Sequence, residues 1–381
     1  MGSDIARRTY DESRQYRRVV AQQGRAIIEA DLNEAQEIIT EEIRKEALDF
    51  VGPFGTPDNG YEVTVVQGNG APDDLRIGPG TMYVGGMRVE LPAPGVLYSE
   101  QPDWLKDRPI QSDGNKELVC LWLIEQEVSA VEDQALREVA LGGPDTAQRT
   151  RLLQKFVRFG VASGVTDCEA AIAALTHDFT AHGFYFDDKT ARFGSTSRLE
   201  ADFDPTPASS DPCSPLTQAG YLGAENQLIR VWTNSLPENT LLWAYDNASA
   251  IYRVKSATFD VAKQLTVIEL ASSPVDAHHE PRVGQWVEGL ICAVDFDNGN
   301  CAANPYGEPI QIASAYDHAK RTFDLNIQRS QAELDEVVAL GLFVRVWEEL
   351  LAFTPGTPVK LGETGLSVTL TNTPQTAIGD Y

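Results

Sequence analysis

The chain has 381 residues, of which 42% are hydrophobic, so it is long enough to bury a sizeable core in two or three domains. Its formal net charge of -25 at pH 7 argues against binding to a nucleic-acid backbone, because that attraction comes from clustered lysine and arginine. No apolar run approaches the roughly 18 to 20 residues that cross a bilayer, and the arginine-rich start has no apolar signal-peptide segment. We therefore expect a protein assembled in the cytoplasm, with no nucleic-acid partner and no membrane insertion.

An amphipathic helix is predicted over residues 26–51. Its apolar residues recur at the three- and four-residue spacing of one helical face, and they are Ile28, Leu32, Ala35, Ile39 and Ile43. Gly52 and Pro53 end the helix. Such a stripe must be buried against something. It is narrow and contains a small alanine, so a seam between identical helices is as reasonable a place for it as the protein's own core.

Arginines gather ahead of this helix, in a chain that is otherwise acidic. They are Arg7, Arg8, Arg14, Arg17 and Arg18, followed by Arg25. One interpretation is that they dock onto an acidic partner, or onto the acidic body of a neighbouring copy. The other is a solvated helix end.

The remainder of the chain predicts a mainly β fold, with antiparallel sandwich- or barrel-like domains and small helical inserts. Short alternating runs separated by glycine-rich turns follow the helix. Residues 118–124 and 154–159 are expected in one sheet, a helix is expected over 167–179, and 195–215 has the composition of a linker. Further strands are predicted at 228–232, 241–243, 251–254, 265–270, 343–347 and 366–370, and a second helix at 323–338. We expect an arm and oligomerisation or attachment helix at 1–52, a first β-rich domain at 53–200 and a second at 201–381.

The connection between the strands at 118–124 and 154–159 is predicted to be a structural loop. Its expected residues are Arg137, Glu138, Gly142, Gly143, Pro144, Asp145 and Arg149. Asp145 and Thr146 could cap a helix through residues 147–153, and a buried Glu138 or Asp145 paired to Arg149 would lock the connection. The loop lacks the lysine and the spacing of a P-loop, which argues against a phosphate cradle.

No catalytic, metal or cofactor site is predicted. Residues 295–300 resemble a calcium loop, but glycine falls fifth where an EF-hand needs it sixth, which favours a hairpin turn. His278 and His279 would point to opposite faces of a strand, with no third ligand signalled. The five cysteines are Cys120, Cys168, Cys213, Cys292 and Cys301, and their odd number and wide spacing predict reduced thiols. A hairpin disulfide between Cys292 and Cys301 is the alternative.

Several motifs carry a resemblance to one family. They are QQGR at residues 22–25, EADLNE at 29–34, REVALGGPDTAQRT at 137–150, GYLGAENQLIRV at 220–231 and WAYDNAS at 243–249. Together they resemble an uncharacterised domain family associated with phage-tail-like contractile injection systems. The chain departs from the family pattern at Leu32, where relatives have tryptophan, and at Ala244 and Tyr245, where relatives have serine and arginine.

The resemblance implies a structural subunit and no catalytic residues. On this reading the chain forms a homo-oligomer, a trimer or a hexamer, that contacts baseplate, spike or tube proteins and is carried on an extracellular or membrane-targeting particle. The alternative is a glycan-binding module or glycan hydrolase borne on such a particle. It rests on aromatic residues that could stack on sugars, namely Trp232, Trp243, Tyr245, Tyr252, Trp286 and Trp347.

Overall fold

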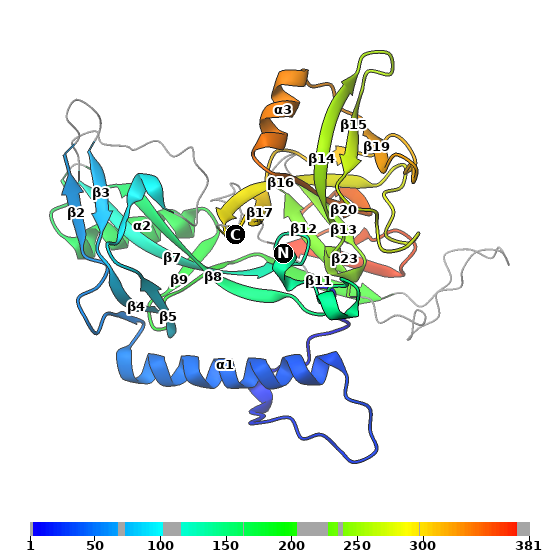
Figure 1. Cartoon of the computed structure of the whole chain (residues 1–381). Helices are drawn as coiled ribbons and strands as arrows, with labels where there is room; N and C mark the ends of the chain where they lie inside the picture. The colour runs from blue at the N-terminus through cyan, green and yellow to red at the C-terminus, as the bar shows by residue number, and fades with distance from the viewer. Residues whose placement is uncertain are drawn as a thin grey trace.

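The protein folds as two antiparallel β lobes with one long helix beneath them, as the computed structural model shows (Figure 1). The structure describes residues 3–67, 73–101, 116–162, 164–203, 228–234, 239–296 and 298–371. The mainly β class, the N-terminal helix and the small helical inserts are confirmed. The helix, α1, spans Glu29–Val51 and ends at Gly52, whose backbone N–H donates to the carbonyl of Leu48.

The first lobe consists of small sheets arranged around a long two-stranded ribbon. The sheets are β1 (Phe54–Gly55) with β4 (Gly80–Val84) and β5 (Met87–Leu91), β2 (Val63–Val66) with β3 (Asp74–Ile77) and β6 (Val96–Leu97), and β9 (Phe184–Asp187) with β10 (Arg192–Ser195). The ribbon pairs β7 (Glu117–Val128) with β8 (Arg149–Gly160) along their full length, which confirms that residues 118–124 and 154–159 lie in one sheet. Ile77, Tyr98 and Phe156 lie in the core that joins sheet and ribbon.

The predicted helical insert is α2 (Cys168–Ala181), and Asp167 caps it by accepting from the N–H of Ala170. The helix packs on the ribbon through aromatic rings. The ring of Phe179 meets those of Trp122 and Phe159 edge to face.

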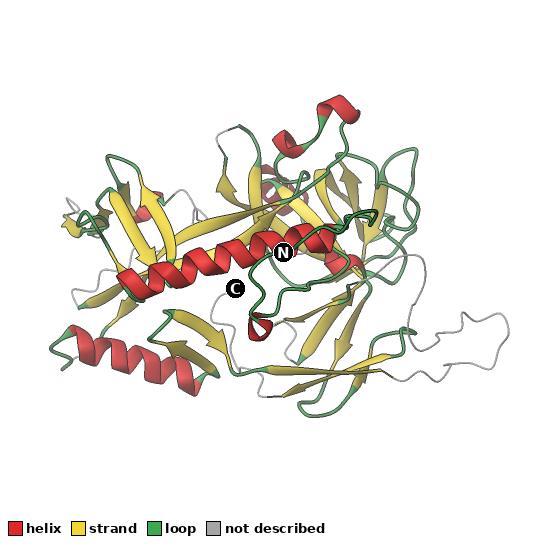
Figure 2. Ribbon diagram, turned by 90° about the horizontal axis from the view of Figure 1, so that it is seen from below, coloured by secondary structure: helices red, strands yellow, loops and turns green. Residues whose placement is uncertain are grey.

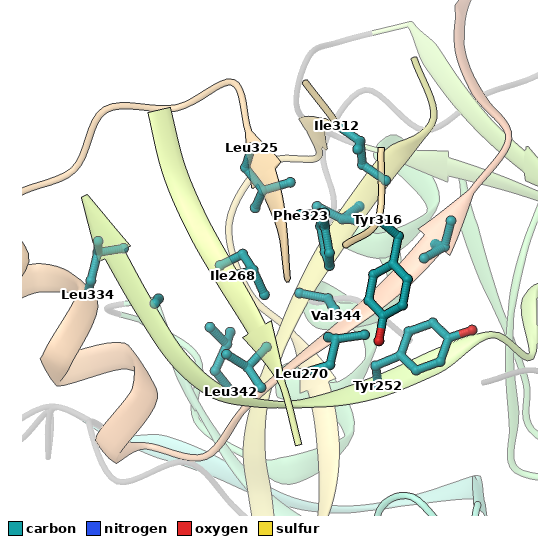
Figure 3. Packing of buried hydrophobic residues seen from close by; sticks show 14 of the residues in the cluster. Tyr252, Ile268, Leu270, Ile312, Tyr316, Phe323, Leu325, Leu334, Leu342 and Val344 are labelled. Carbon is teal, nitrogen blue, oxygen red and sulfur yellow. The ribbon is translucent and has the colours of Figure 1, made fainter. Parts of the chain in front are cut away.

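The second lobe is built on a large sheet with the strand order β17-β16-β20-β14-β15-β19. These strands are β14 (Ile251–Asp260), β15 (Leu265–Leu270), β16 (Trp286–Asp295), β17 (Cys301–Pro305), β19 (Thr322–Leu325) and β20 (Leu342–Trp347), and β18 (Ile310–Gln311) also pairs with β16. Smaller sheets join β12 (Arg230–Asn234), β13 (Thr240–Ala244) and β21 (Glu349–Ala352), and β11 (Arg198–Phe203), β23 (Leu366–Thr371) and β22 (Val359–Lys360). The core of the large sheet gathers Ile268, Phe323 and Val344 (Figure 3).

Three predicted elements are wrong. Residues 147–153 are not helical, because Arg149–Gly160 pairs along β7. Residues 323–338 are not one helix: Thr322–Leu325 is strand β19, and α3 (Gln331–Ala339) begins only after Ser330, which forms a capping box with Glu333. Residues 195–215 are not all linker, since Arg198–Phe203 pairs with β23, and the domain boundary placed at 200 falls within that strand.

The prediction of reduced thiols at Cys292 and Cys301 is also wrong, because these two cysteines form a disulfide between β16 and β17. In this hairpin Cys292 is paired with Ala303 and Cys301 with Asp295, the register shifts between Cys292 and Val294, and the Cα atoms of the two cysteines are 5.5 Å apart. The hairpin turn predicted at residues 295–300 is confirmed by the bond from Phe296 N–H to the carbonyl of Asn300. Cys120 and Cys168 are free, and Cys213 lies outside the described residues.

The two lobes are joined at the free edge of β17. The N–H of Ala303 donates to Oε1 of Glu132 at 3.0 Å, and the carbonyl of Ala303 accepts from Nε2 of Gln126 at 3.0 Å. Oε2 of Glu132 accepts from both N–H and hydroxyl of Ser129. Glu132 is 1% exposed and Gln126 is 4% exposed, so these bonds are buried. At Ala303 the two side chains from the first lobe satisfy the backbone groups that a neighbouring strand would otherwise bind.

We predict that Glu132→Ala destabilises the protein by about 3 kcal/mol, because it leaves buried N–H donors of Ser129 and Ala303 without an acceptor. Chemical denaturation followed by tryptophan fluorescence measures the change. Glu138→Ala is the matched control, since Glu138 lies on the same connection but is exposed and caps only Ala140. Equal effects of the two substitutions would contradict this account of the lobe junction.

The same carboxyl predicts a pH dependence of stability. Burial, the largest cause, raises the pKa of Glu132 above its ordinary value of 4.5. The folded protein then holds this proton more tightly than the unfolded chain, so the contribution is present below pH 4.5 and is lost as pH rises through the raised pKa. We expect the stability of the wild type relative to Glu132→Gln to fall from pH 4.5 upward. A stability difference that is flat with pH would contradict the prediction.

Candidate functional site

The predicted apolar stripe of α1 is exposed to solvent. Ile28, Leu32, Ile39 and Ile43 are 38%, 60%, 55% and 61% exposed, and Ala35 is partly buried. Phe50, which the sequence analysis missed, extends the same face and is 89% exposed. The interpretation that the protein's own core covers this stripe is therefore wrong. We call Ile28, Leu32, Ile39, Ile43 and Phe50 the α1 stripe.

The stripe is straight because it follows an 11-residue repeat. Ile28, Ile39 and Phe50 are spaced by eleven residues, and so are Leu32 and Ile43. Eleven residues make slightly more than three turns of an α-helix, so side chains at this spacing stay nearly in line along the helix. From Ile28 to Phe50 the stripe is about 33 Å long at 1.5 Å per residue. This repeat is the sequence signal that identifies Phe50 as a member of the stripe, because it continues the pattern to the end of the helix.

The N-terminal arm covers a different face of α1, and it does so with charged groups. Arg8 pairs with Glu37 at 2.8 Å, Arg17 with Glu42 at 2.7 Å and Lys45 with Glu12 at 2.9 Å. The hydroxyl of Thr9 donates to Glu34 at 2.6 Å. These partners surround Ile38, which is 2% exposed. Each exposed ion pair contributes little stability alone, but together they determine which face of the helix the arm lies on.

The helix is bound to the first lobe, and the arm that precedes it is bound to the second. Near its C-terminal end, Nε of buried Arg44 donates to the carbonyl of Gly85 at 2.7 Å, in the turn between β4 and β5. Gly86 packs so closely that a Cβ there would overlap the backbone oxygen of Arg44. In the arm, the carbonyl of Ser3 accepts from the side chain of Asn247 in the second lobe at 2.9 Å. Figure 2 shows α1 lying across the underside of the molecule.

The segment between the arm and α1 projects away from the helix as the dark-blue loop at the base of Figure 1. We call Tyr16–Ile27 the arm hook. Every residue in it except Val19 is exposed, and Tyr16, Val20 and Ile27 expose 54%, 67% and 65% of their surface. Of the predicted attachment arginines, Arg17 pairs with Glu42, and Arg18 and Arg25 lie exposed on the hook.

The predicted structural loop is an exposed turn and not a buried lock. Glu138, Asp145 and Arg149 are exposed, which excludes the buried carboxylate that was expected to pair with Arg149. The backbone is nevertheless held tightly: Gly143 N–H donates to the carbonyl of Glu138, and Glu138 N–H donates to that of Pro144. Arg137 forms a β-bridge with Asp145, and Gly142 and Gly143 both have positive φ. The loop presents Val139 to solvent, 85% exposed.

The histidines at 278 and 279 are arranged differently from the prediction. They do not point to opposite faces, since Nε2 of each lies 3.8 Å from Oδ2 of Asp246 and Nδ1 of His279 lies 2.7 Å from Oδ1 of Asp276. Within the described residues, no group of three or more histidine, cysteine, aspartate or glutamate side chains is arranged to hold a metal ion. No described helix is both long and apolar enough to cross a membrane.

The aromatic residues considered for sugar stacking are at least partly covered. Trp243, Tyr252 and Trp347 are 3%, 7% and 1% exposed. Trp232, Tyr245 and Trp286 are partly buried. Their ring faces are used within the second lobe: Trp243, for example, meets Tyr245 edge to face and donates its N–H to Glu349.

Residues 1–183 match a family described as a family of unknown function, DUF6519. The matched region contains the arm, α1, the exposed loop at 137–145 and α2, and the large sheet of the second lobe lies beyond it. No curated protein and no solved structure matches the chain. The candidate site, composed of the α1 stripe and the arm hook, thus lies wholly in the part of the chain that this family shares.

We predict that Gly86→Ala loosens α1 from the first lobe. The added Cβ overlaps the backbone of Arg44, and φ at Gly86 is +78°, which favours glycine. Limited trypsin digestion should cut α1 after Arg44 and Lys45 at least about tenfold faster than in wild type, equivalent to about 1.4 kcal/mol of local opening, because Arg44 is buried and Lys45 is partly buried in the folded helix. Gly142→Ala is the matched control, because its φ is +93° but its Cβ would meet nothing within 4 Å. Equal cleavage rates in the two variants would show that close packing at Gly86 does not hold the helix.

Proposed function

We propose that this protein is a structural subunit of a phage-tail-like contractile particle that self-associates through α1. The observation that carries the proposal is the exposed α1 stripe, a row of apolar side chains about 33 Å long on a helix that is bound to the first lobe and whose preceding arm is bound to the second. Exposed apolar side chains gathered on one face are a feature of interaction sites, because removing apolar area from water favours association. Assembly in the cytoplasm and later transport on the particle are part of the same proposal.

The type of particle is proposed from the motifs. The QQGR and EADLNE runs lie on the arm hook and the first turns of α1, and REVALGGPDT forms the exposed turn of the first lobe. The family-like motifs described by the structure therefore include surface segments as well as core strands. Surface segments shared within a family are expected where subunits contact one another or a common partner.

The particle-borne glycan module receives less support. Stacking on a sugar needs an aromatic face open to solvent, and none of the six aromatic residues considered for that role is an exposed side chain. The structural subunit is therefore the function that the described residues support best.

We predict that Leu32→Glu with Ile39→Glu converts an oligomer into a monomer. Both side chains lie on the stripe and would be buried by association. Replacing these two apolar groups with charges should weaken association by at least about 100-fold, or about 2.7 kcal/mol. Light scattering coupled to size exclusion measures the mass.

The matched control is Asn33→Glu with Thr40→Glu, which adds the same charge at neighbouring exposed positions beside the stripe. The control should retain the wild-type mass. A wild-type protein that is monomeric at all concentrations tested would overturn self-association, and a control that also dissociates would show that added charge, and not loss of the stripe, is responsible.

A further inference from the structure

We propose that the arm hook of one copy packs along the α1 stripe of a neighbouring copy. This inference rests on the proposed function and adds to it the identity of the partner surface. Each copy would donate its hook to one neighbour and receive a hook from another.

The first argument is charge complementarity. The hook contains Arg17, Arg18 and Arg25 and no acidic residue, whereas α1 contains eight acidic residues and only two basic ones. Both basic residues of α1 are engaged on its covered faces, Arg44 with Gly85 and Glu41, and Lys45 with Glu12. In a chain with a formal charge of -25, a segment carrying +3 is the natural counterpart of an acidic helix.

The second argument concerns Glu46, which disfavours pairing of two identical stripes. Glu46 follows Ala35 by eleven residues, so it continues the repeat and lies on the stripe between Ile39 and Phe50. Its side chain is exposed. If two α1 stripes packed together, each would bury a carboxylate against a helix whose cations face elsewhere, which is costly. A hook supplies apolar side chains and a guanidinium to the same surface.

The third argument is that hook and stripe match in apolar character and in length. Tyr16, Val20 and Ile27 expose apolar surface at intervals along the hook. Its twelve residues reach about 40 Å when extended, compared with about 33 Å for the stripe. Within the hook the described backbone forms one turn, from Arg25 N–H to the carbonyl of Gln22, so most of its backbone groups remain free to adapt to a partner.

Packing on the stripe of its own helix does not explain the hook. Arg17 holds the beginning of the hook against Glu42 on the arm-covered face, and the hook ends where α1 begins. Between these two points it bulges away from the helix, as Figure 1 shows. The stripe lies on another face of α1, so its occupant must come from a different molecule.

A contact between two different surfaces has a consequence for symmetry. It is heterologous, so repetition generates a closed ring when the rotation closes and a filament when it does not. A contact between two α1 stripes would instead be isologous and stop at two copies.

The proposal is tested by mixing two purified full-length variants. The stripe variant carries Leu32→Glu and Ile39→Glu and keeps its hook. The hook variant carries Arg18→Glu and Arg25→Glu, two exposed arginines, and keeps its stripe. Arg149→Glu with Arg329→Glu serves as the charge-matched control, because both of these arginines are exposed and lie outside the hook.

We expect each variant alone to be monomeric, with association at least 100-fold weaker than in wild type, and the control to keep the wild-type mass. The equimolar mixture should form a complex of one copy of each, since one hook and one stripe remain intact, and light scattering should show twice the monomer mass. If the hook variant alone stays oligomeric and the stripe variant does not join it, stripes pair with each other and the inference is wrong. A monomeric wild type would overturn the proposed function as well.

Discussion

The charged contacts between the N-terminal arm and α1 determine which face of the helix the chain itself can cover. Arg8, Arg17 and Glu12 pair with Glu37, Glu42 and Lys45, so the arm lies on the acidic face around Ile38. A helix in an isolated domain usually does the opposite and buries its apolar face, because apolar burial is the dominant favourable term in folding. Here the polar face is occupied within the molecule and the apolar face is left open. The apolar face of α1 is therefore not used for packing among the described residues, and this is why we propose that it takes part in a contact between molecules.

The presentation of that face depends on the junction between the lobes. The helix is attached to the first lobe at Gly85, whereas the arm that precedes it is attached to the second lobe at Asn247. If the lobes moved relative to each other, these two anchors would pull on α1 in different directions. Glu132 and Gln126 prevent this by binding both backbone groups of Ala303 at the edge of β17. A buried pair of side-chain contacts far from the helix thus contributes to the rigidity of the surface that α1 offers.

Sequence pattern predicted the elements whose neighbours are close in the chain. The alternation in β8 and the apolar run in β7 placed two strands in one sheet, where the structure shows them paired with each other, and the period of α1 identified the helix. Prediction failed where the secondary structure of a segment depends on pairing with residues far away in the sequence. Arg198–Phe203 has the composition of a linker, and it is a strand only because β23, far along the chain, pairs with it. Residues 323–338 were expected to form one helix, but pairing of Phe323 and Leu325 with β15 makes the start of that segment a strand. The candidate site was found as a stripe, yet which face the arm would cover could not be read from the spacing, because it depends on individual ion pairs.

The two interactions of the N-terminal region differ in how they respond to their surroundings. The ion pairs that place the arm on α1 are exposed, so salt screens them and each contributes little. Contact between apolar side chains on a stripe depends on the area removed from water and not on screening. A neighbouring copy that covers the α1 stripe would therefore supply most of the strength of association, whereas the arginines select which segment docks and in which direction. Covering the stripe would also hold the helix from its other side, so that an arm only weakly bound in the monomer becomes fixed in the assembly. In the proposed assembly, the stability of the N-terminal region and the association of the subunits would therefore be coupled through one helix.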